Sequence, residues 1–433
     1  MSRHYICGRE MMVSLPFDRQ DLKALAVLLG AALVVRLLLF SLDGYVNDLA
    51  TYQYWFNTAA TQGVHSFYPY VLQHAGWIDY PPFNVYIFWI FGSLSQTFAS
   101  VDPVFFVKLA PTIFDLATCG LIYLFLRKQL SYRGTIIATA FYAFNPAVIF
   151  NVAIWGQFDA IYTFFIVLAL ILALKKKPEF SAGVFAVALL TKPQAIALLP
   201  LVVLLIFKKN GIKRLLTSAG AFVATIFGVI LPFNWSGNPI DFLSGIYFGA
   251  YDGYQYTSIN AFNLWGLFGL WVPDGGFYIV GWVLFGGFSA ITLYILHKRL
   301  YASGELLAVF GAFLLLFAFF MLPTRIHERY LFPALSMLVL LLPFGKKIRV
   351  LYAGLTATLF INQAYVLYFL NAERFIEHNL MAAVPRVDGV VLLVCIANLG
   401  LLLYASLLLW REFESRRFKT VEPLNQSANG NEH

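Results

Sequence analysis

The sequence predicts an all-α polytopic membrane protein, and composition and patterning support this fold class. Hydrophobic residues make up 60% of the 433-residue chain, and only 12% of its residues are charged. A soluble domain carries about twice that share of charged residues. The mean hydropathy is +0.73, and long apolar runs alternate with short clusters of Lys and Arg. Because one membrane span needs about 20 apolar residues, the chain can hold about a dozen.

The distribution of charge predicts which loops face the cytoplasm. Residues 37–107 contain no Lys or Arg, although they include Asp48 and Asp79. Basic residues concentrate in cytoplasmic loops. We therefore expect 1–21 to be a cytoplasmic N-terminal segment and 43–102 to be a large first loop on the extracytoplasmic side.

We expect the transmembrane domain over 22–410 and a polar cytoplasmic tail over 411–433. Within the domain, apolar length and loop charge predict twelve spans. They lie at 22–42, 103–126, 135–150, 158–174, 180–190, 195–207, 215–231, 277–296, 306–322, 331–342, 351–370 and 390–410.

Two apolar stretches fit more than one topology. Residues 82–98 are apolar enough to cross, but a crossing would place the next basic cluster outside. We therefore expect a helix that lies in, or dips into, the outer interface. Residues 180–207 are interrupted at Lys192 and Pro193. Proline disfavours a helical residue before it, so we expect two short helices, with a single kinked helix as the alternative.

Composition and spacing also exclude several function classes. The net charge of +8 comes from basic residues scattered among juxtamembrane loops, so it does not predict nucleic-acid binding. The three cysteines lie far apart, and no His or Cys cluster has the spacing of metal ligands. No glycine-rich nucleotide-binding loop is visible. The sequence thus predicts no metal, no cofactor and no nucleic-acid partner.

Two carboxylates in the first external loop are candidate catalytic residues. Asp48 follows the first span, and a carboxylate near the apolar leaflet can act as a general base. The alternative is a helix N-cap or a solvated loop acid. Asp79 precedes Tyr80 and two prolines. It is either a second carboxylate of the same pocket or part of a structural turn.

Polar residues between later spans are candidate binding residues. Trp155, Gln157 and Asp159 combine a flat apolar face with polar groups, which is typical of sugar recognition, although an ordinary loop is the alternative. The Tyr-rich stretch 247–263 predicts an external loop that binds an acceptor, or a set of aromatic anchors at the interface.

Cationic residues outside the membrane or within apolar runs are candidate phosphate ligands. Lys192 and Gln194 interrupt an apolar stretch, where an ionisable residue favours function over a snorkelling lysine. Downstream, arginines and a histidine surround a glutamate. Arg grips phosphate oxygens with two donors, and His adds another donor. The alternative is an internal salt bridge. These residues are Arg325, His327, Glu328 and Arg329.

Together these motifs resemble the GT-C superfamily, the polytopic glycosyltransferases that use polyprenyl-phosphate sugars. The resemblance extends over about 22–342 and rests on the order, spacing and common sidedness of the motifs. Two groups are most similar. One comprises the dolichyl-phosphate-glucose-dependent glucosyltransferases of N-glycan precursor assembly. The other comprises the bacterial and archaeal proteins similar to the second mannosyltransferase of GPI-anchor synthesis.

The resemblance implies a GT-C-type fold, with interfacial helices in the first external loop, and a role for each matching residue. Asp48 takes the place of the catalytic base, and Asp79 belongs to the second loop motif. The donor phosphate would be bound by Lys192, Arg325, His327 and Arg329. The sugar or acceptor would be bound by Tyr80, Trp155, Gln157, Asp159, Gln194 and Glu328.

The implied activity is that of an inverting hexosyltransferase with a polyprenyl- or dolichyl-phosphate sugar donor. The acceptor would be a hydroxyl of a lipid-linked molecule or glycan outside the cytoplasm. The glucosyltransferases have a histidine-rich segment where this chain has Trp155 to Asp159, which favours mannose over glucose. The expected location is a bacterial or archaeal plasma membrane, or the endoplasmic reticulum of a eukaryote. The alternative is a transporter or flippase of lipid-linked sugars, which Arg36, Asp115 and Lys192 with Pro193 would fit.

Overall fold

The computed structural model describes residues 19–372 and 386–415, and their regular structure is entirely helical. This confirms the all-α prediction. Most of the predicted N-terminal segment and of the predicted tail lies outside the described residues. The helices are α1 (Arg19–Leu39), α2 (Val46–Ala75), α3 (Pro82–Thr97), α4 (Pro103–Leu126), α5 (Tyr132–Ala143), α6 (Pro146–Ile149), η1 (Phe150–Trp155), α7 (Asp159–Leu174), α8 (Pro178–Leu189), η2 (Pro193–Leu198), α9 (Leu199–Ile230), α10 (Pro239–Asp252), η3 (Trp265–Leu267), α11 (Phe277–Met321), α12 (Phe332–Val339), η4 (Leu342–Phe344), α13 (Lys346–Ala372) and α15 (Gly389–Ser415).

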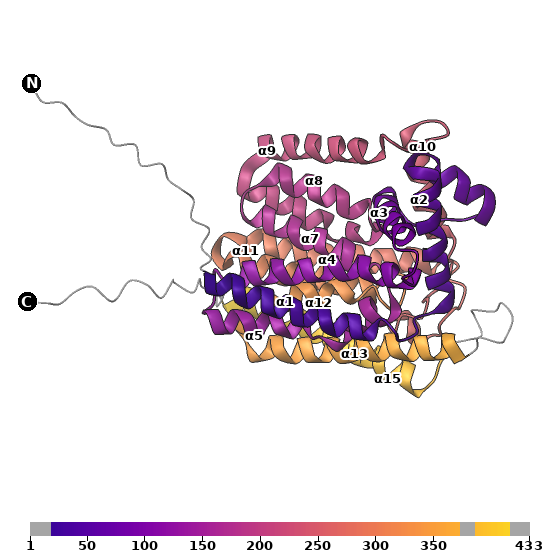
Figure 1. Cartoon of the computed structure of the whole chain (residues 1–433). Helices are drawn as coiled ribbons and strands as arrows, with labels where there is room; N and C mark the ends of the chain where they lie inside the picture. The colour runs from indigo at the N-terminus through magenta and orange to yellow at the C-terminus, as the bar shows by residue number, and fades with distance from the viewer. Residues whose placement is uncertain (1–18, 373–385, 416–433) are drawn as a thin grey trace, which may run out of the picture.

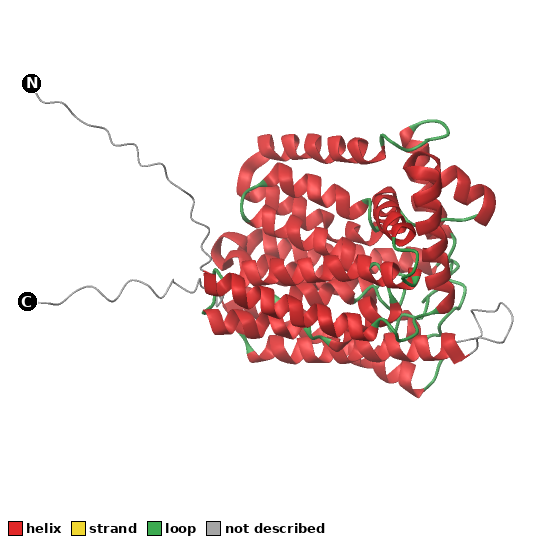
Figure 2. Cartoon of the chain, viewed as in Figure 1, coloured by secondary structure: helices red, strands yellow, loops and turns green. Residues whose placement is uncertain are grey.

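The long helices run side by side, and α2, α3 and α10 gather at one end of the bundle (Figure 1). Figure 2 shows most of the loops at this same end. Figure 1 views α3 nearly along its axis, so this helix runs across the direction of the bundle. The fold thus separates a packed helical body from one end that is rich in loops.

By length and composition, seven described helices can cross a membrane, or eight if the bent pair Tyr132–Ala143 and Pro146–Trp155 forms one span. The chain is therefore an integral membrane protein. Helices α7 and α8 are apolar but shorter, so twelve crossings remain a prediction. Left-handed glycines break the two longest helices, Gly211 in α9 and Gly304 in α11. Both breaks fall between segments that the sequence predicted as separate spans.

The structure decides between the alternatives for one of the two ambiguous stretches and leaves the other as a prediction. Helix α8 ends at Leu189, and a new helical segment begins at Pro193, so 180–207 is not a single kinked helix. Residues 82–97 form the single helix α3, which is not long enough to count among the candidate spans. Its expected position in the membrane interface remains a prediction.

Two of the three charged residues that favoured a transporter are bound to each other. The Arg36 guanidinium in α1 lies 2.6 Å from Oδ2 of Asp115 in α4, and both side chains are fully buried. Breaking such a buried pair leaves an uncompensated charge, which costs about 3–5 kcal/mol. The pair therefore joins α1 to α4 within the bundle.

An aromatic cluster fixes the end of the bundle that carries the loops. Rings from α2, α3 and the start of α7 pack together, with Phe56 5.4 Å from Phe88 and 6.0 Å from Phe158 between centroids. Helices α2 and α3 approach closely at Gly92, where an added Cβ would collide with the backbone carbonyl of Phe56. This packing orients the first turn of α2 and the loop that precedes α3.

Gly92→Ala is expected to destabilise the protein by about 1–3 kcal/mol, because overpacking forces two helices apart. The measurement is the thermal unfolding midpoint of the detergent-solubilised protein. Gly120→Ala in α4 is the control, because a Cβ there meets nothing within 4 Å. Equal unfolding midpoints for the two variants would contradict the close contact between α2 and α3.

Candidate active site

Asp48 lies in the first turn of α2, and its carboxylate is bound by two side chains from another element. Oδ2 accepts a hydrogen bond of 2.9 Å from Nε1 of Trp155 and one of 2.7 Å from Nε2 of Gln157. Tyr45, not Asp48, occupies the N-cap of α2. The N-cap alternative for Asp48 is therefore wrong.

The local backbone explains why both donors reach the same carboxylate. Residues 150–155 form a π-helix, a rare conformation that is frequent at functional sites. Gly156 follows in the left-handed region with φ of 82°. A Cβ at Gly156 would lie 3.1 Å from Leu49 and 3.3 Å from Lys108. Glycine thus allows the turn that directs Trp155 and Gln157 toward α2.

A second set of hydrogen bonds joins Tyr80, the residue that follows Asp79, to this group. Tyr52 donates to Oε1 of Gln157 over 3.1 Å, and its hydroxyl lies 2.7 Å from that of Tyr80. Oδ1 of Asp79 is buried and has no hydrogen-bond partner among the described residues. At least one oxygen of the Asp79 carboxylate is therefore not used to lock the turn.

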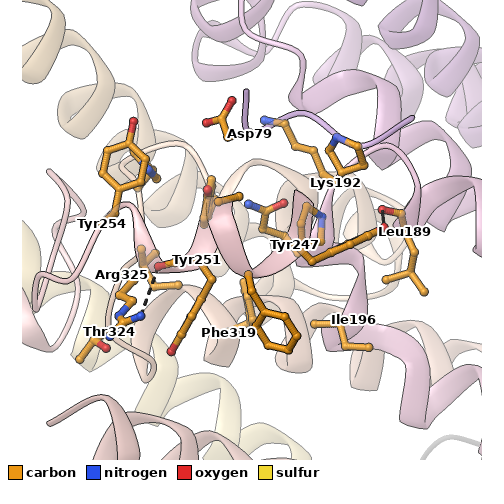
Figure 3. Close-up of a pocket in the computed structure, with 18 of the residues that line it drawn as sticks. Asp79, Leu189, Lys192, Ile196, Tyr247, Tyr251, Tyr254, Phe319, Thr324 and Arg325 are labelled. Carbon is orange, nitrogen blue, oxygen red and sulfur yellow. Dashed lines mark hydrogen bonds between the residues drawn. The ribbon is translucent and has the colours of Figure 1, made fainter. Parts of the chain in front are cut away.

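The first turn of α3 directly follows the loop that carries Asp79, and it is hydrogen-bonded to the turn that carries Lys192. The backbone N–H of Phe83 donates to the carbonyl of Leu190 over 2.9 Å, and Nδ2 of Asn84 donates to the carbonyl of Thr191 over 2.6 Å. In Figure 3 the Lys192 amine and the Asp79 carboxylate point toward one another. Residues far apart in sequence therefore meet at one place.

Lys192 and Arg329 share a buried carboxylate. Nζ of Lys192 lies 2.9 Å from Oδ1 of Asp159, and Nε of Arg329 lies 3.7 Å from Oδ2 of the same residue. A terminal nitrogen of Arg329 also contacts Glu328 over 2.7 Å. Asp159 is fully buried, and its ion pairs with both cations hold them in place.

Arg325 belongs to a different group of residues. Its Nε lies 2.7 Å from Asp274, and a terminal nitrogen lies 3.2 Å from Asp252 at the end of α10. Its guanidinium carbon lies 4.2 Å from the centre of the Tyr251 ring. The internal salt bridge expected at Glu328 therefore forms with Arg329 and not with Arg325, whose partners the sequence did not predict.

Burial and neighbouring charges shift the pKa values of the ionisable site residues. Burial raises the pKa of both Asp48 and Asp79, although the nearby Arg329 opposes the shift in each case. Burial, Arg329 and Lys192 together lower the pKa of His327 well below its usual range. We therefore expect His327 to act as a neutral hydrogen-bonding group.

Two cavities meet at this group of residues. The larger has a volume of about 560 Å³ and is lined by Lys192, Gln194 and Arg325, with many aromatic residues from α10 and α11. The smaller, of about 120 Å³, contains Asp48, Trp155 and Glu328. Both are lined by the same five residues at their junction: Asp79, Tyr80, Tyr254, His327 and Arg329.

The structure therefore places ten of the twelve predicted site residues on the walls of these two cavities, with two exceptions. Gln157 and Asp159 line neither cavity; they contact Asp48 and Lys192 from behind. Tyr254 was not predicted individually, although it lies in the Tyr-rich stretch that the sequence indicated as a binding loop. The sequence did not single out Asp274 as a site residue, because an acidic residue in a polar loop is common.

Among the described residues, no group of three or more His, Cys, Asp or Glu side chains is arranged to hold a metal ion. The walls of the two cavities instead carry the carboxylates of Asp48, Asp79 and Glu328 and the cations of Lys192, Arg325 and Arg329. Such a set can accept a proton on one side and stabilise an anion on the other.

An all-helical membrane body with carboxylates and cations gathered at one end fits a membrane-embedded transferase, and comparison with known families shows which family it belongs to. The chain belongs to glycosyltransferase family 87, whose model matches residues 77–323, more than half of the chain. No match was found among curated proteins. The matched region contains Asp79, Trp155 and Lys192; Asp48 and Arg329 lie outside it. The protein is thus a membrane glycosyltransferase.

Proposed function

We propose that this glycosyltransferase moves a hexose from a polyprenyl- or dolichyl-phosphate donor to a hydroxyl of a lipid-linked or glycan acceptor. Mannose is favoured over glucose as the hexose. The reaction takes place on the extracytoplasmic side of a bacterial or archaeal plasma membrane, or on the lumenal side of the endoplasmic reticulum in a eukaryote.

The junction of the two cavities is the observation that carries this proposal. The larger cavity is suited to a lipid donor because aromatic residues of α10 and α11 line it, and Phe248 at its rim is 66% exposed. Its polar end holds Lys192 and Arg329, which fit a phosphate group. The smaller cavity holds Asp48 and leaves room for an acceptor hydroxyl.

The proposed reaction is a single displacement. The acceptor oxygen forms a bond to the anomeric carbon while its proton passes to Asp48. The bond between the anomeric carbon and the phosphate oxygen breaks, and its electron pair stays on the phosphate. Attack from the opposite face inverts the anomeric configuration. No general acid is needed, because the phosphate leaves as an anion.

Charge is conserved within the site during this step. Asp48 loses one negative charge on protonation, and the departing phosphate gains one. Lys192 and Arg329 face the place where the new charge develops, which is the arrangement that lowers a barrier electrostatically. Arg329 lines both cavities, so it interacts with the charge before and after the transfer.

The experiment that tests the donor uses membranes that contain the full-length protein. They are incubated with radiolabelled polyprenyl-phosphate-mannose and, separately, with the glucose analogue. We expect label to appear in a new product with the mannose donor and to be weaker or absent with glucose. Membranes without the protein provide the background.

The outcomes separate the alternatives. Stronger transfer from the glucose donor would overturn the sugar preference but keep the donor class. If neither lipid-linked donor gives product while a nucleotide sugar does, the donor class is wrong. Movement of labelled lipid between leaflets without a new glycosidic bond would support the flippase alternative.

A further inference from the structure

The sequence assigned Trp155 and Gln157 to sugar or acceptor binding, but their geometry points to a different role. Both side chains are buried, and both donate to the same carboxylate oxygen, Oδ2 of Asp48. Trp155 is 1% exposed and Gln157 is fully buried, so Gln157 presents no polar atom to a substrate.

We infer that Trp155 and Gln157 form a two-donor clamp that holds Oδ2 of Asp48 and presents Oδ1 as the atom that receives the acceptor proton. The inference rests on the proposed function, since it assumes that Asp48 is the base. Gln157 is then a positioning residue, because it acts on the substrate only through Asp48.

The hydrogen bonds of Gln157 fix its own orientation as well. Its Oε1 accepts from Tyr52 while its Nε2 donates to Asp48, so rotation of the amide by 180° would break both bonds. Tyr52 in turn contacts Tyr80, which directly follows Asp79. One chain of hydrogen bonds therefore sets the positions of both loop carboxylates relative to each other.

The position of Oδ1 agrees with this role. Among the described residues no hydrogen bond to Oδ1 of Asp48 is found, whereas Oδ2 has two. Asp48 lines the smaller cavity together with Thr51 and Trp77. An unoccupied carboxylate oxygen at a cavity wall is available to a hydroxyl, and correct placement of a reacting group can be worth about 100-fold in rate per 1 Å.

The clamp also affects the proton affinity of Asp48. Donated hydrogen bonds favour the ionised carboxylate, so Trp155 and Gln157 lower the pKa that burial raises. The other titratable or charged groups that face Asp48 or share its cavity are Tyr45, Tyr52, Asp79, Tyr80, Lys192, Tyr254, His327, Glu328 and Arg329. Among these groups, Tyr52 donates a hydrogen bond to Gln157, so a change at Gln157 that preserves its shape removes this bond as well.

The test is Gln157→Met, which keeps the length of the side chain and removes its donor. We expect kcat/KM to fall by about 10-fold to 100-fold. The acidic limb of the pH profile should move to higher pH, because Asp48 loses a bond that stabilises its charge. Trp155→Phe should shift the limb in the same direction, and Tyr52→Phe should shift it less.

The control is Gln363→Met, the same change at a buried glutamine of α13 that lines neither cavity. It should leave the pH profile unchanged. If Gln157→Met lowers the rate without moving the acidic limb, the residue is structural and the clamp is overturned. If Asp48→Asn itself retains full activity, the assignment of the base is wrong, which is a separate failure.

Discussion

Asp48→Asn is expected to lower the rate of sugar transfer by about 10³-fold, within the range that a positioned general base contributes. Asn has nearly the shape of Asp, and its carbonyl oxygen can still accept from Trp155 and Gln157. The fold should therefore persist while the proton acceptor is lost. The measurement is kcat with a saturating lipid-linked donor, together with the unfolding midpoint of the purified protein.

Variants of two other acidic residues test whether the loss of rate is specific to Asp48. Asp43→Asn changes an exposed acid in the segment between α1 and α2 and should leave the rate within a few-fold of wild type. Asp79→Asn should have an intermediate effect, because Asp79 lies at the cavity junction but lacks the donors that hold Asp48. A larger loss at Asp79 than at Asp48 would exchange the roles of the two carboxylates.

The pH dependence of wild type follows from the same residue. The ionised form of Asp48 is the active form, and burial raises its pKa. Activity should therefore fall as the pH drops through this raised pKa, at a higher pH than an exposed aspartate would give. His327 is neutral over this range because its pKa is lowered, so it should not produce the acidic limb.

The sequence predicted the fold class and the grouping of the site for clear physical reasons. Apolar runs and basic clusters are determined by the bilayer, so they can be seen without any structure. The same charge rule placed Asp48, Lys192 and Arg329 on one side. The structure then brings all three to one end of the bundle, although the side of the membrane itself remains a prediction.

The contacts within the site could not be predicted in the same way. Hydropathy does not indicate the π-helix before Gly156, which directs Trp155 and Gln157 to Asp48. The sequence also treated Arg325 and Arg329 as equivalent cations. Only the three-dimensional arrangement separates them, because the partners of Arg325 come from loops near α10 and α11.

Arg329→Met is expected to lower kcat by about 10²–10³-fold, because one preorganised donor to a developing anion contributes this much. Arg329 lies where the two cavities meet, and it is held by Glu328 and Asp159 at 2.7 Å and 3.7 Å. Burial opposes its charge, but these carboxylates raise its pKa well above the ordinary value, so it stays cationic. Arg329→Lys keeps the charge and loses only the planar guanidinium, so kcat should fall less than in Arg329→Met.

Arg325→Met is the matched comparison, because it removes the same group four residues away. Its guanidinium is bound by Asp274 and Asp252 and lines only the larger cavity, so we expect kcat to change less than that of Arg329→Met. Loss of Arg329 should also move the acidic limb to higher pH, since it removes the cation that most favours ionised Asp48. Loss of Arg325 should leave the acidic limb where it is, because Arg325 is not among the groups that shift the pKa of Asp48. Equal effects of the two variants on both kcat and the limb would mean that neither arginine is placed at the reacting phosphate.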